Sequence, residues 1–124
     1  AGRIDYFGTG LDRIDPSNGR FRFGVSDDDK IEGNRGLEIA RRCVTELMYD
    51  LVILDEINSS TELGIIDEKS VLEIIDAKMG TIEFILTGRN APQSFIDRAD
   101  LVSEVKLHKH YFYHGVKARE GIDY

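Results

Sequence analysis

Two short apolar runs, each ending in polar residues, constrain the fold of this chain more than any other feature. Leu51–Leu54 leads into Asp55 and Glu56, and the largely apolar Ile82–Leu86 leads into Thr87-Gly88-Arg89. Such runs are typical of strands covered on both faces, as in a parallel sheet. The two runs are therefore predicted to be parallel neighbours, with helices on both faces, in an α/β fold with right-handed crossovers.

Helical periodicity lies on both sides of the first run. Apolar residues recur at spacings of three and four from Leu37 to Met48, and Asn34 is the predicted N-cap of that helix. A second helix is predicted over Glu68–Lys78, and Pro92 opens a short one that ends near Arg98. Four residues are predicted on the inner side of the second helix: Val71, Leu72, Ile75 and Met79.

Two further strands are predicted near the ends of the chain. Arg3–Phe7 is short and β-prone and stops at the glycine turn Gly8-Thr9-Gly10, and Leu101–Val105 gives a final strand. Residues 12–26 are predicted to form an edge hairpin, inserted into a single domain of residues 1–124, with a turn at 16–19. The run Asp27–Asp29 is predicted to be a solvated loop.

Composition bounds the classes of function. The 124 residues contain 23 Asp and Glu against 16 Lys and Arg, a formal net charge of -7, which disfavours binding to nucleic acid or to an anionic membrane. No apolar run approaches the ~20 residues of a membrane span. The single cysteine, Cys43, lies beside an apolar stripe and is predicted to fill the core, and one thiol suits a reducing compartment. We therefore expect a cytoplasmic protein.

Three polar groups follow predicted strands: Gly8-Thr9-Gly10, Asp55-Glu56 and Thr87-Gly88-Arg89. Ligands of open parallel sheets bind beyond the carboxyl ends of the strands, so these groups are predicted to converge on one cleft. An acidic pair after an apolar strand resembles a Walker B element and suits Mg²⁺ beside a triphosphate. A guanidinium at the next strand end suits phosphate oxygens.

Several segments together resemble one family of enzymes. In chain order they are 51–58 (LVILDEIN), 86–92 (LTGRNAP), 99–104 (ADLVSE), 109–110 (KH) and 115–124 (GVKAREGIDY). This series is similar to the ATP:corrinoid (cob(I)alamin, cob(I)yrinic acid a,c-diamide) adenosyltransferases of the P-loop type. The likeness runs from about Leu37 to Tyr124, with a fainter match over Arg3–Gly10.

The resemblance implies a cytoplasmic homodimer with a three-layer, mostly parallel sheet of the P-loop, RecA-like type. It implies transfer of the 5′-deoxyadenosyl group of ATP to the cobalt of a reduced corrinoid, with release of tripolyphosphate and with a flavoprotein as reductant. By match to the family motifs, Asp55 and Glu56 would serve Mg²⁺ and the phosphates, and Arg89 a phosphate. Gly10 and Leu11 would belong to the cofactor-binding turn.

The sequence departs from the family pattern in two places. The 124 residues contain no G-x-x-x-x-G-K-[ST] phosphate loop and hence no first strand leading into one, so we expect the chain by itself to adenosylate corrinoids poorly or not at all. The family typically has aromatic residues just after the glycine turn, where this chain has Leu11 and Arg13.

Two other functions remain open from the sequence. A catalytically silent nucleotide- or corrinoid-binding module of the same fold fits the missing phosphate loop. A phospho-acceptor receiver domain fits the length and the positions of Asp55, Thr87 and Lys109, but no acidic pair follows the first strand.

Overall fold

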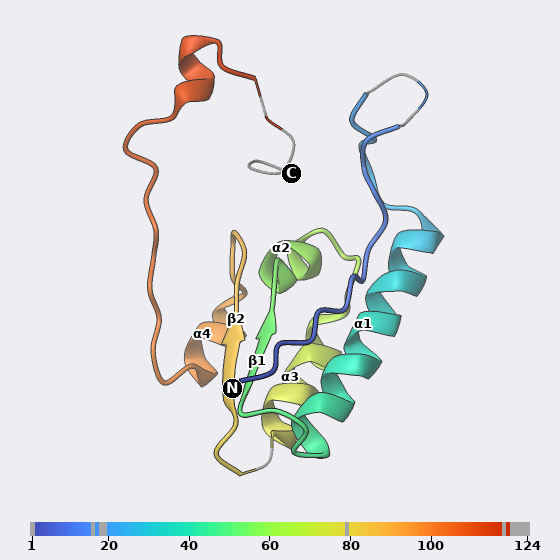
Figure 1. The fold of residues 1–124 in the computed structure, drawn as a ribbon, viewed down its shortest axis with the longest axis vertical. Coiled ribbons are helices and arrows are strands. Elements are labelled where there is room, and N and C mark those ends of the chain that lie inside the picture. Colours follow the sequence, from blue (N-terminus) through green and yellow to red (C-terminus); the bar gives the residue numbers. More distant parts are fainter. Residues whose placement is uncertain (1, 16, 18–19, 79, 118, 120–124) are drawn as a thin grey trace.

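The computed structural model describes residues 2–15, 17, 20–78, 80–117 and 119. The helices pack around a small two-stranded sheet, and an extended tail follows the last α-helix (Figure 1). The elements are α1 (Asp27–Thr45), β1 (Leu51–Leu54), α2 (Ile57–Glu62), α3 (Glu68–Ala77), β2 (Glu83–Leu86), α4 (Gln93–Arg98) and the 3₁₀ helix η1 (Tyr111–His114).

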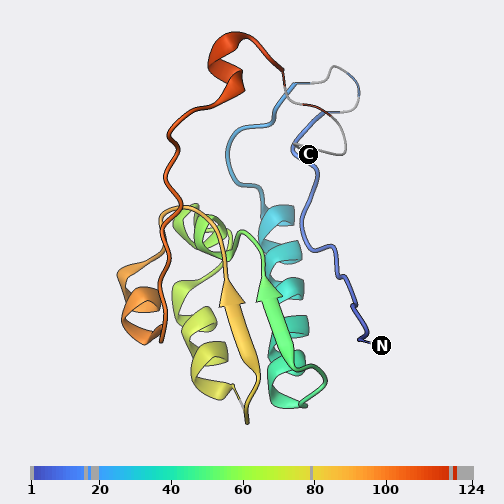
Figure 2. The same ribbon diagram turned by 60° about the vertical axis from the view of Figure 1, so that its left-hand side comes forward.

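The sheet consists of β1 and β2, which pair in parallel as predicted. Leu51 pairs with Glu83 and Leu54 with Leu86, so the two carboxyl ends are level. Helices α1 and α3 lie together behind the two strands in Figure 2. The molecule is therefore a mixed α/β fold with a two-stranded parallel sheet.

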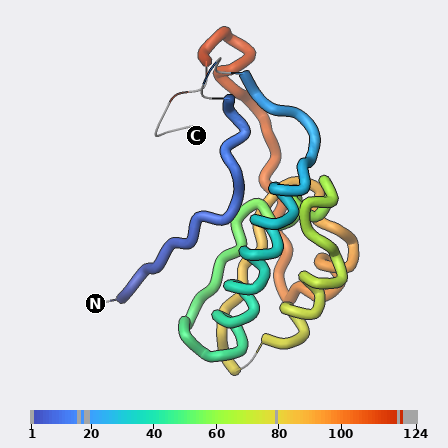
Figure 3. Tube along the Cα trace, turned by 90° about the vertical axis from the view of Figure 1, so that its right-hand side faces the viewer, coloured from blue at the N-terminus to red at the C-terminus, as the bar shows by residue number. Residues whose placement is uncertain are grey.

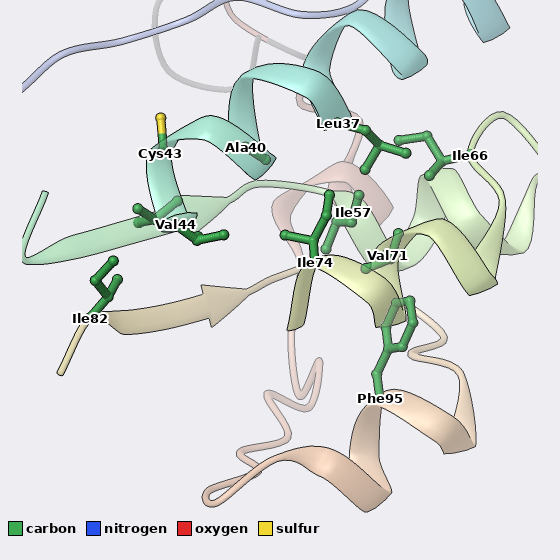
Figure 4. Close-up of a cluster of buried hydrophobic side chains, with 11 residues drawn as sticks. Leu37, Ala40, Cys43, Val44, Ile57, Ile66, Val71, Ile74, Ile82 and Phe95 are labelled. Atoms are coloured by element: carbon green, nitrogen blue, oxygen red, sulfur yellow. The ribbon is translucent and has the colours of Figure 1, made fainter. Parts of the chain in front are cut away.

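One hydrophobic core holds the helices against the sheet (Figure 4). Its centre is formed by Val44 of α1 and by Val71 and Ile74 of α3, whose side chains are fully buried. Phe95 of α4 closes the core on one side. Cys43 is buried in this core, as predicted, and burial raises the pKa of its thiol.

The opposite face of the sheet is open, so the prediction of cover on both faces is wrong for the described residues. Leu51 and Ile53 are 47% and 54% exposed, and Ile85 beside them is 44% exposed. These side chains share one face because they alternate with the core residues Val52 and Phe84. The apolar runs predicted burial, but the chain supplies helices to one side only.

Helix α1 begins seven residues before its predicted N-cap, and the predicted solvated loop Asp27–Asp29 is its first turn. Ser26 caps the helix, and its hydroxyl and main-chain N–H both donate to Asp29 (2.8 and 2.7 Å). Asn34 lies inside the helix and donates to the carbonyl oxygen of Lys30. The prediction of a loop is wrong because Asp29, the third acid of the run, is the N3 residue of a capping box, a role that charge patterning does not reveal.

Arg22 links the segment before α1 to the same cap through an ion pair. Its guanidinium donates to both oxygens of the buried Asp29 carboxylate (2.7 and 2.9 Å). This pairing, followed by the bonds from Ser26, holds the pKa of Asp29 well below its usual range. The described part of residues 12–26 turns back on itself through one antiparallel bridge between Ile14 and Phe21.

The two terminal strands that the sequence predicts do not form. Arg3–Phe7 runs beside the helical body without pairing, held by a hydrogen bond from the Tyr49 hydroxyl to Asp5 (2.7 Å) (Figure 3). Leu101–Val105 extends away from the sheet after α4, and Val105 is 97% exposed. β-prone composition predicts extended backbone, but a strand also needs an edge with which to pair.

The remaining elements follow the sequence closely, with one addition. Helix α3 spans almost the whole predicted range, with Ile74 as an inner residue that the prediction omitted, and α4 begins directly after Pro92. Met79 and three residues of the predicted turn at 16–19 lie outside the described residues. Helix α2 was not predicted, because it is short and rich in Asn, Ser and Thr, which favour turns and caps.

Truncating one isoleucine in the core and one on the open face of the sheet should distinguish the two faces by their effect on stability. Ile74→Ala is expected to lower the free energy of unfolding by about 2–5 kcal/mol, because it leaves a cavity in the core. Ile53→Ala removes the same atoms from the open face and is expected to cost less than about 1.5 kcal/mol. Urea unfolding of both variants measures this, and equal losses would contradict the open face.

The cap of α1 should make stability depend on pH at the acidic end. The pKa of Asp29 is lowered by folding, so its contribution is complete above the unfolded value of about 3.9 and is lost as the pH falls below it. Asp29→Asn is expected to flatten the loss of stability between about pH 5 and pH 3, measured as the urea midpoint. Asp28→Asn, an exposed neighbour on the same turn, is the control and should keep the wild-type profile.

Candidate functional site

The parallel register places the residues after β1 beside the residues after β2. The main-chain N–H of Thr87 continues the sheet by donating to Leu54 (3.1 Å). Its hydroxyl donates to Oδ1 of Asp55 (2.6 Å) and accepts from the main-chain N–H of Glu56 (3.0 Å). One threonine hydroxyl thus joins the acidic pair to the neighbouring strand.

Glu56 turns the chain from β1 into α2. It has a left-handed backbone (φ 55°, ψ 22°), a conformation that costs a glutamate free energy and persists only where the surroundings impose it. Its carboxylate accepts a hydrogen bond from the hydroxyl of Ser59 (2.6 Å), and its carbonyl accepts from the N–H of Ser60 (3.0 Å). The turn is therefore held from both its side chain and its main chain.

The Thr87-Gly88-Arg89 turn lies directly against α2. Asn58 donates from its main chain to the carbonyl of Thr87 (3.1 Å) and from its amide to the carbonyl of Gly88 (3.3 Å). The N–H of Arg89 donates to the Ser59 hydroxyl (3.0 Å). Since that hydroxyl also bonds to Glu56, a chain of hydrogen bonds joins the acidic pair to the arginine turn.

Gly88 is required at this contact. Its φ of 121° is outside the range that residues with a Cβ readily adopt, and a Cβ would lie 3.0 Å from the Ser59 hydroxyl oxygen and 3.1 Å from the Ser59 nitrogen. The close approach of the two turns therefore depends on this glycine.

The Arg89 side chain is exposed and, among the residues that the structure describes, makes no ion pair. It lines a hollow of about 760 Å³ together with part of the tail. The other lining residues are Val105, Lys106, Leu107, His110, Phe112 and Tyr113. The hollow beside the guanidinium is thus lined by one lysine, one histidine, and aliphatic and aromatic side chains.

The acidic pair offers donors that suit Mg²⁺. Asp55 and Glu56 are both exposed, and in each carboxylate one oxygen accepts the hydroxyl bond described above while the other has no partner among the residues that the structure describes. The described residues contain no group of three or more His, Cys, Asp or Glu side chains that is placed to hold a metal ion. Mg²⁺ bound beside a nucleotide needs only one or two carboxylates, with phosphate oxygens and water completing its octahedron. The donor set fits such a shared ion.

Gly10 and Leu11, the other predicted cofactor-binding residues, lie on the segment before α1. Gly8 of that segment accepts a hydrogen bond from Arg35 of α1 (2.7 Å). Within the described part of the chain, no hydrogen bond or ion pair joins Gly10 or Leu11 to the acidic pair or to Arg89. Their role in cofactor binding stays a prediction.

Sequence reasoning missed two residues of this site, Asn58 and Ser59. Asn58 is 7% exposed, and its amide oxygen is buried without a partner among the described residues. The polar residues 58–61 begin one position after the acidic pair and read as a loop, because Asn and Ser favour turns.

The fold and the site together define an α/β protein with a candidate phosphate and metal site at the carboxyl edge of a parallel sheet. Residues 18–124 match the family model described as ATP:corrinoid adenosyltransferase BtuR/CobO/CobP. The chain belongs to this family.

Individual relatives agree with the family match. A corrinoid adenosyltransferase of Sinorhizobium sp. is 34% identical over 97 residues, which is 77% of this chain and 45% of the relative. The corrinoid adenosyltransferase CobA of Salmonella typhimurium is 36% identical over 84 residues, 68% of this chain and 43% of the relative. An uncharacterized protein of Nostoc, all2391, is 36% identical over 98 residues, 77% of this chain and 26% of the relative. The chain thus spans less than half the length of these relatives.

No helix among the described residues has the length and apolar character to cross a membrane.

Adding a methyl group at Gly88 should disturb both turns at once. In Gly88→Ala, the new Cβ would clash with atoms of Ser59, and the alanine would have to adopt a φ that is unfavourable for it. In Gly64→Ala, the φ of 70° is also unfavourable, but no atom lies within 4 Å of the new Cβ. We expect Gly64→Ala to cost about 1–2 kcal/mol of unfolding free energy, and Gly88→Ala about 1 kcal/mol or more beyond that.

Urea unfolding measures the difference, and amide NMR shifts report where the structure changes. Shifts of Ser59 and Arg89 are expected only in Gly88→Ala. Equal costs for the two variants, with Ser59 unmoved, would contradict the close contact.

Proposed function

We propose that this chain carries the metal and phosphate side of an ATP:corrinoid adenosyltransferase. The reaction transfers the 5′-deoxyadenosyl group of ATP to the cobalt of a reduced corrinoid and releases tripolyphosphate. The observation that carries the proposal is the hydrogen-bonded connection between the acidic pair after β1 and the Thr-Gly-Arg turn after β2. Family membership supplies the reaction.

Asp55 and Glu56 would hold Mg²⁺ through the carboxylate oxygens that accept no hydrogen bond within the described part of the chain. When bound, the ion offsets charge on the triphosphate and makes it a better leaving group. The protein's own contribution is to present two carboxylates in fixed orientations, so that little reorganisation is needed when the nucleotide arrives.

Arg89 would bind a phosphate of the same nucleotide. Its guanidinium makes no ion pair among the described residues, so its charge is available to a ligand. Its main-chain N–H is bonded to the Ser59 hydroxyl, which fixes the backbone from which the side chain extends. A planar guanidinium can donate two parallel hydrogen bonds to phosphate oxygens. This arrangement fits a clamp on the leaving group.

The chemistry explains why the site needs no nucleophilic side chain. Co(I) itself supplies the electron pair that forms the bond to C5′, and the bond from C5′ to the triphosphate oxygen breaks with its electron pair leaving on tripolyphosphate. Cobalt is formally oxidised to Co(III) in that step. The protein has to hold C5′ near the metal and to stabilise the charge of the leaving triphosphate.

The finer features implied by the family belong to the same proposal. They are a three-layer, mostly parallel sheet of the P-loop type that includes β1 and β2, a homodimer, a flavoprotein reductant and a cytoplasmic location. The open face of the sheet, with Ile53 and Ile85 at its centre, is consistent with a further layer.

The silent binding module is the second candidate, because these 124 residues by themselves contain no G-x-x-x-x-G-K-[ST] motif. Turnover separates the two functions: the chain is assayed with cob(I)alamin and MgATP for adenosylated product and tripolyphosphate. We expect slow but measurable product, well below the ~1 per second of an ordinary enzyme. Binding of MgATP with no product at all would favour the silent module.

Removing the Arg89 guanidinium should weaken nucleotide binding. A lost charged hydrogen bond typically costs ~1.5–3 kcal/mol, so Arg89→Ala is expected to raise the Kd for MgATP roughly 10- to 100-fold in calorimetry. Arg98→Ala is the matched control, because it removes the same charge from an arginine that pairs with Asp76 on the surface.

The control variant should bind MgATP like the wild type. Unchanged affinity in Arg89→Ala would show that Arg89 does not bind the nucleotide. Equal weakening in both variants would show only a general effect of the lost positive charge.

A further inference from the structure

The hydroxyl of Thr87 bonds to both residues of the acidic pair, once as a donor and once as an acceptor. Its single proton goes to Oδ1 of Asp55 (2.6 Å), and its oxygen accepts the N–H of Glu56 (3.0 Å). A hydroxyl that both donates and accepts has a fixed torsion. Thr87 therefore bonds to the carboxylate of Asp55 and to the main chain of Glu56.

The main chain of Thr87 is also anchored, which makes its hydroxyl a fixed reference point. Its N–H donates to Leu54 of β1, and its carbonyl accepts from the N–H of Asn58 at the start of α2. Because the main chain of Thr87 is fixed at the sheet edge, its hydroxyl holds Asp55 and the strained turn at Glu56 in place relative to the sheet. With Oδ1 of Asp55 engaged by the hydroxyl, the orientation of its other oxygen is set as well.

We propose that Thr87 is a positioning residue for a divalent cation: it orients the Asp55 carboxylate directly and fixes the main chain from which the Glu56 side chain projects. The inference rests on the proposed function, since it concerns the cation bound with the nucleotide. Partners that orient metal ligands typically contribute 10- to 100-fold to metal affinity. The hydroxyl acts on the cation through the acids, so its loss weakens cation binding and leaves the contacts of the nucleotide with Arg89 in place.

The test compares Thr87→Val, which keeps the shape and removes the hydroxyl, with Thr87→Ser, which keeps the hydroxyl. Mn²⁺ binding at saturating ATP is measured by electron paramagnetic resonance, and ATP binding in EDTA by calorimetry. Thr87→Val is expected to weaken Mn²⁺ binding about tenfold or more, with ATP affinity in EDTA unchanged, and Thr87→Ser to restore Mn²⁺ binding.

Thr45→Val is the matched control. Its hydroxyl donates to the carbonyl of Arg41 near the end of α1, away from the sheet edge, and its removal is expected to change neither affinity. Urea unfolding of each variant reports the structural cost separately. Thr87→Ala is a second hydroxyl-free variant for the case that valine prevents folding, and the same loss of Mn²⁺ affinity is expected.

The outcomes separate this inference from the proposed function. If the wild type binds Mn²⁺ with ATP and Thr87→Val binds it equally well, the positioning role is overturned while the proposed site stands. Equal loss in Thr87→Val and Thr87→Ser overturns it too, because the hydroxyl would not be the cause. If the wild type binds ATP but no Mn²⁺, the metal part of the proposed function fails, and the role of Thr87 fails with it.

Discussion

The parallel pairing of β1 with β2 is the constraint on which the rest of this structure depends. Because Leu54 lies opposite Leu86, both strands end at the same level, and the residue after each one emerges beside the other. Asp55 and Thr87 are 32 positions apart in the chain, yet they form a short hydrogen bond. A shift of the register by one residue would exchange the core and solvent faces of β1 and would separate these two side chains.

Helix α2 converts that alignment into a defined site. Although it has only six residues, its first turn supplies Asn58 and Ser59, which bind the Thr-Gly-Arg turn and the carboxylate of Glu56. The left-handed backbone of Glu56 is maintained by these contacts, and Gly88 gives them the space that they need. Strain concentrated in this way is common where groups must be preorganised for a ligand. The core beneath, with α1 and α3 on one face, provides the rigid support.

The sequence predicts the helices and strands that depend on local patterns of residues. It does not predict structure that depends on contacts between residues far apart in the chain. Leu51–Leu54, Glu68–Ala77 and the helix after Pro92 carry clear periodicity or punctuation, and they form as predicted. The strand predicted at Leu101–Val105 does not form, because composition cannot say whether an edge is available for pairing. The acidic pair and Arg89 were identifiable from their places at strand ends. Ser59 was not, because its role arises only from the contact between two turns.

The central claim is that the carboxyl edge of β1 and β2 binds a nucleotide and its metal ion. Titration of the isotopically labelled chain with Mn²⁺ and ATP tests it most directly, because the paramagnetic ion broadens the NMR signals of nearby residues. The account predicts that the amides of 55–59 and 87–89 broaden first, while those at the far end of the sheet, such as Glu83, and of Ala77 in α3 stay sharp. Broadening centred on the acidic first turn of α1, or spread evenly over the surface, would contradict it.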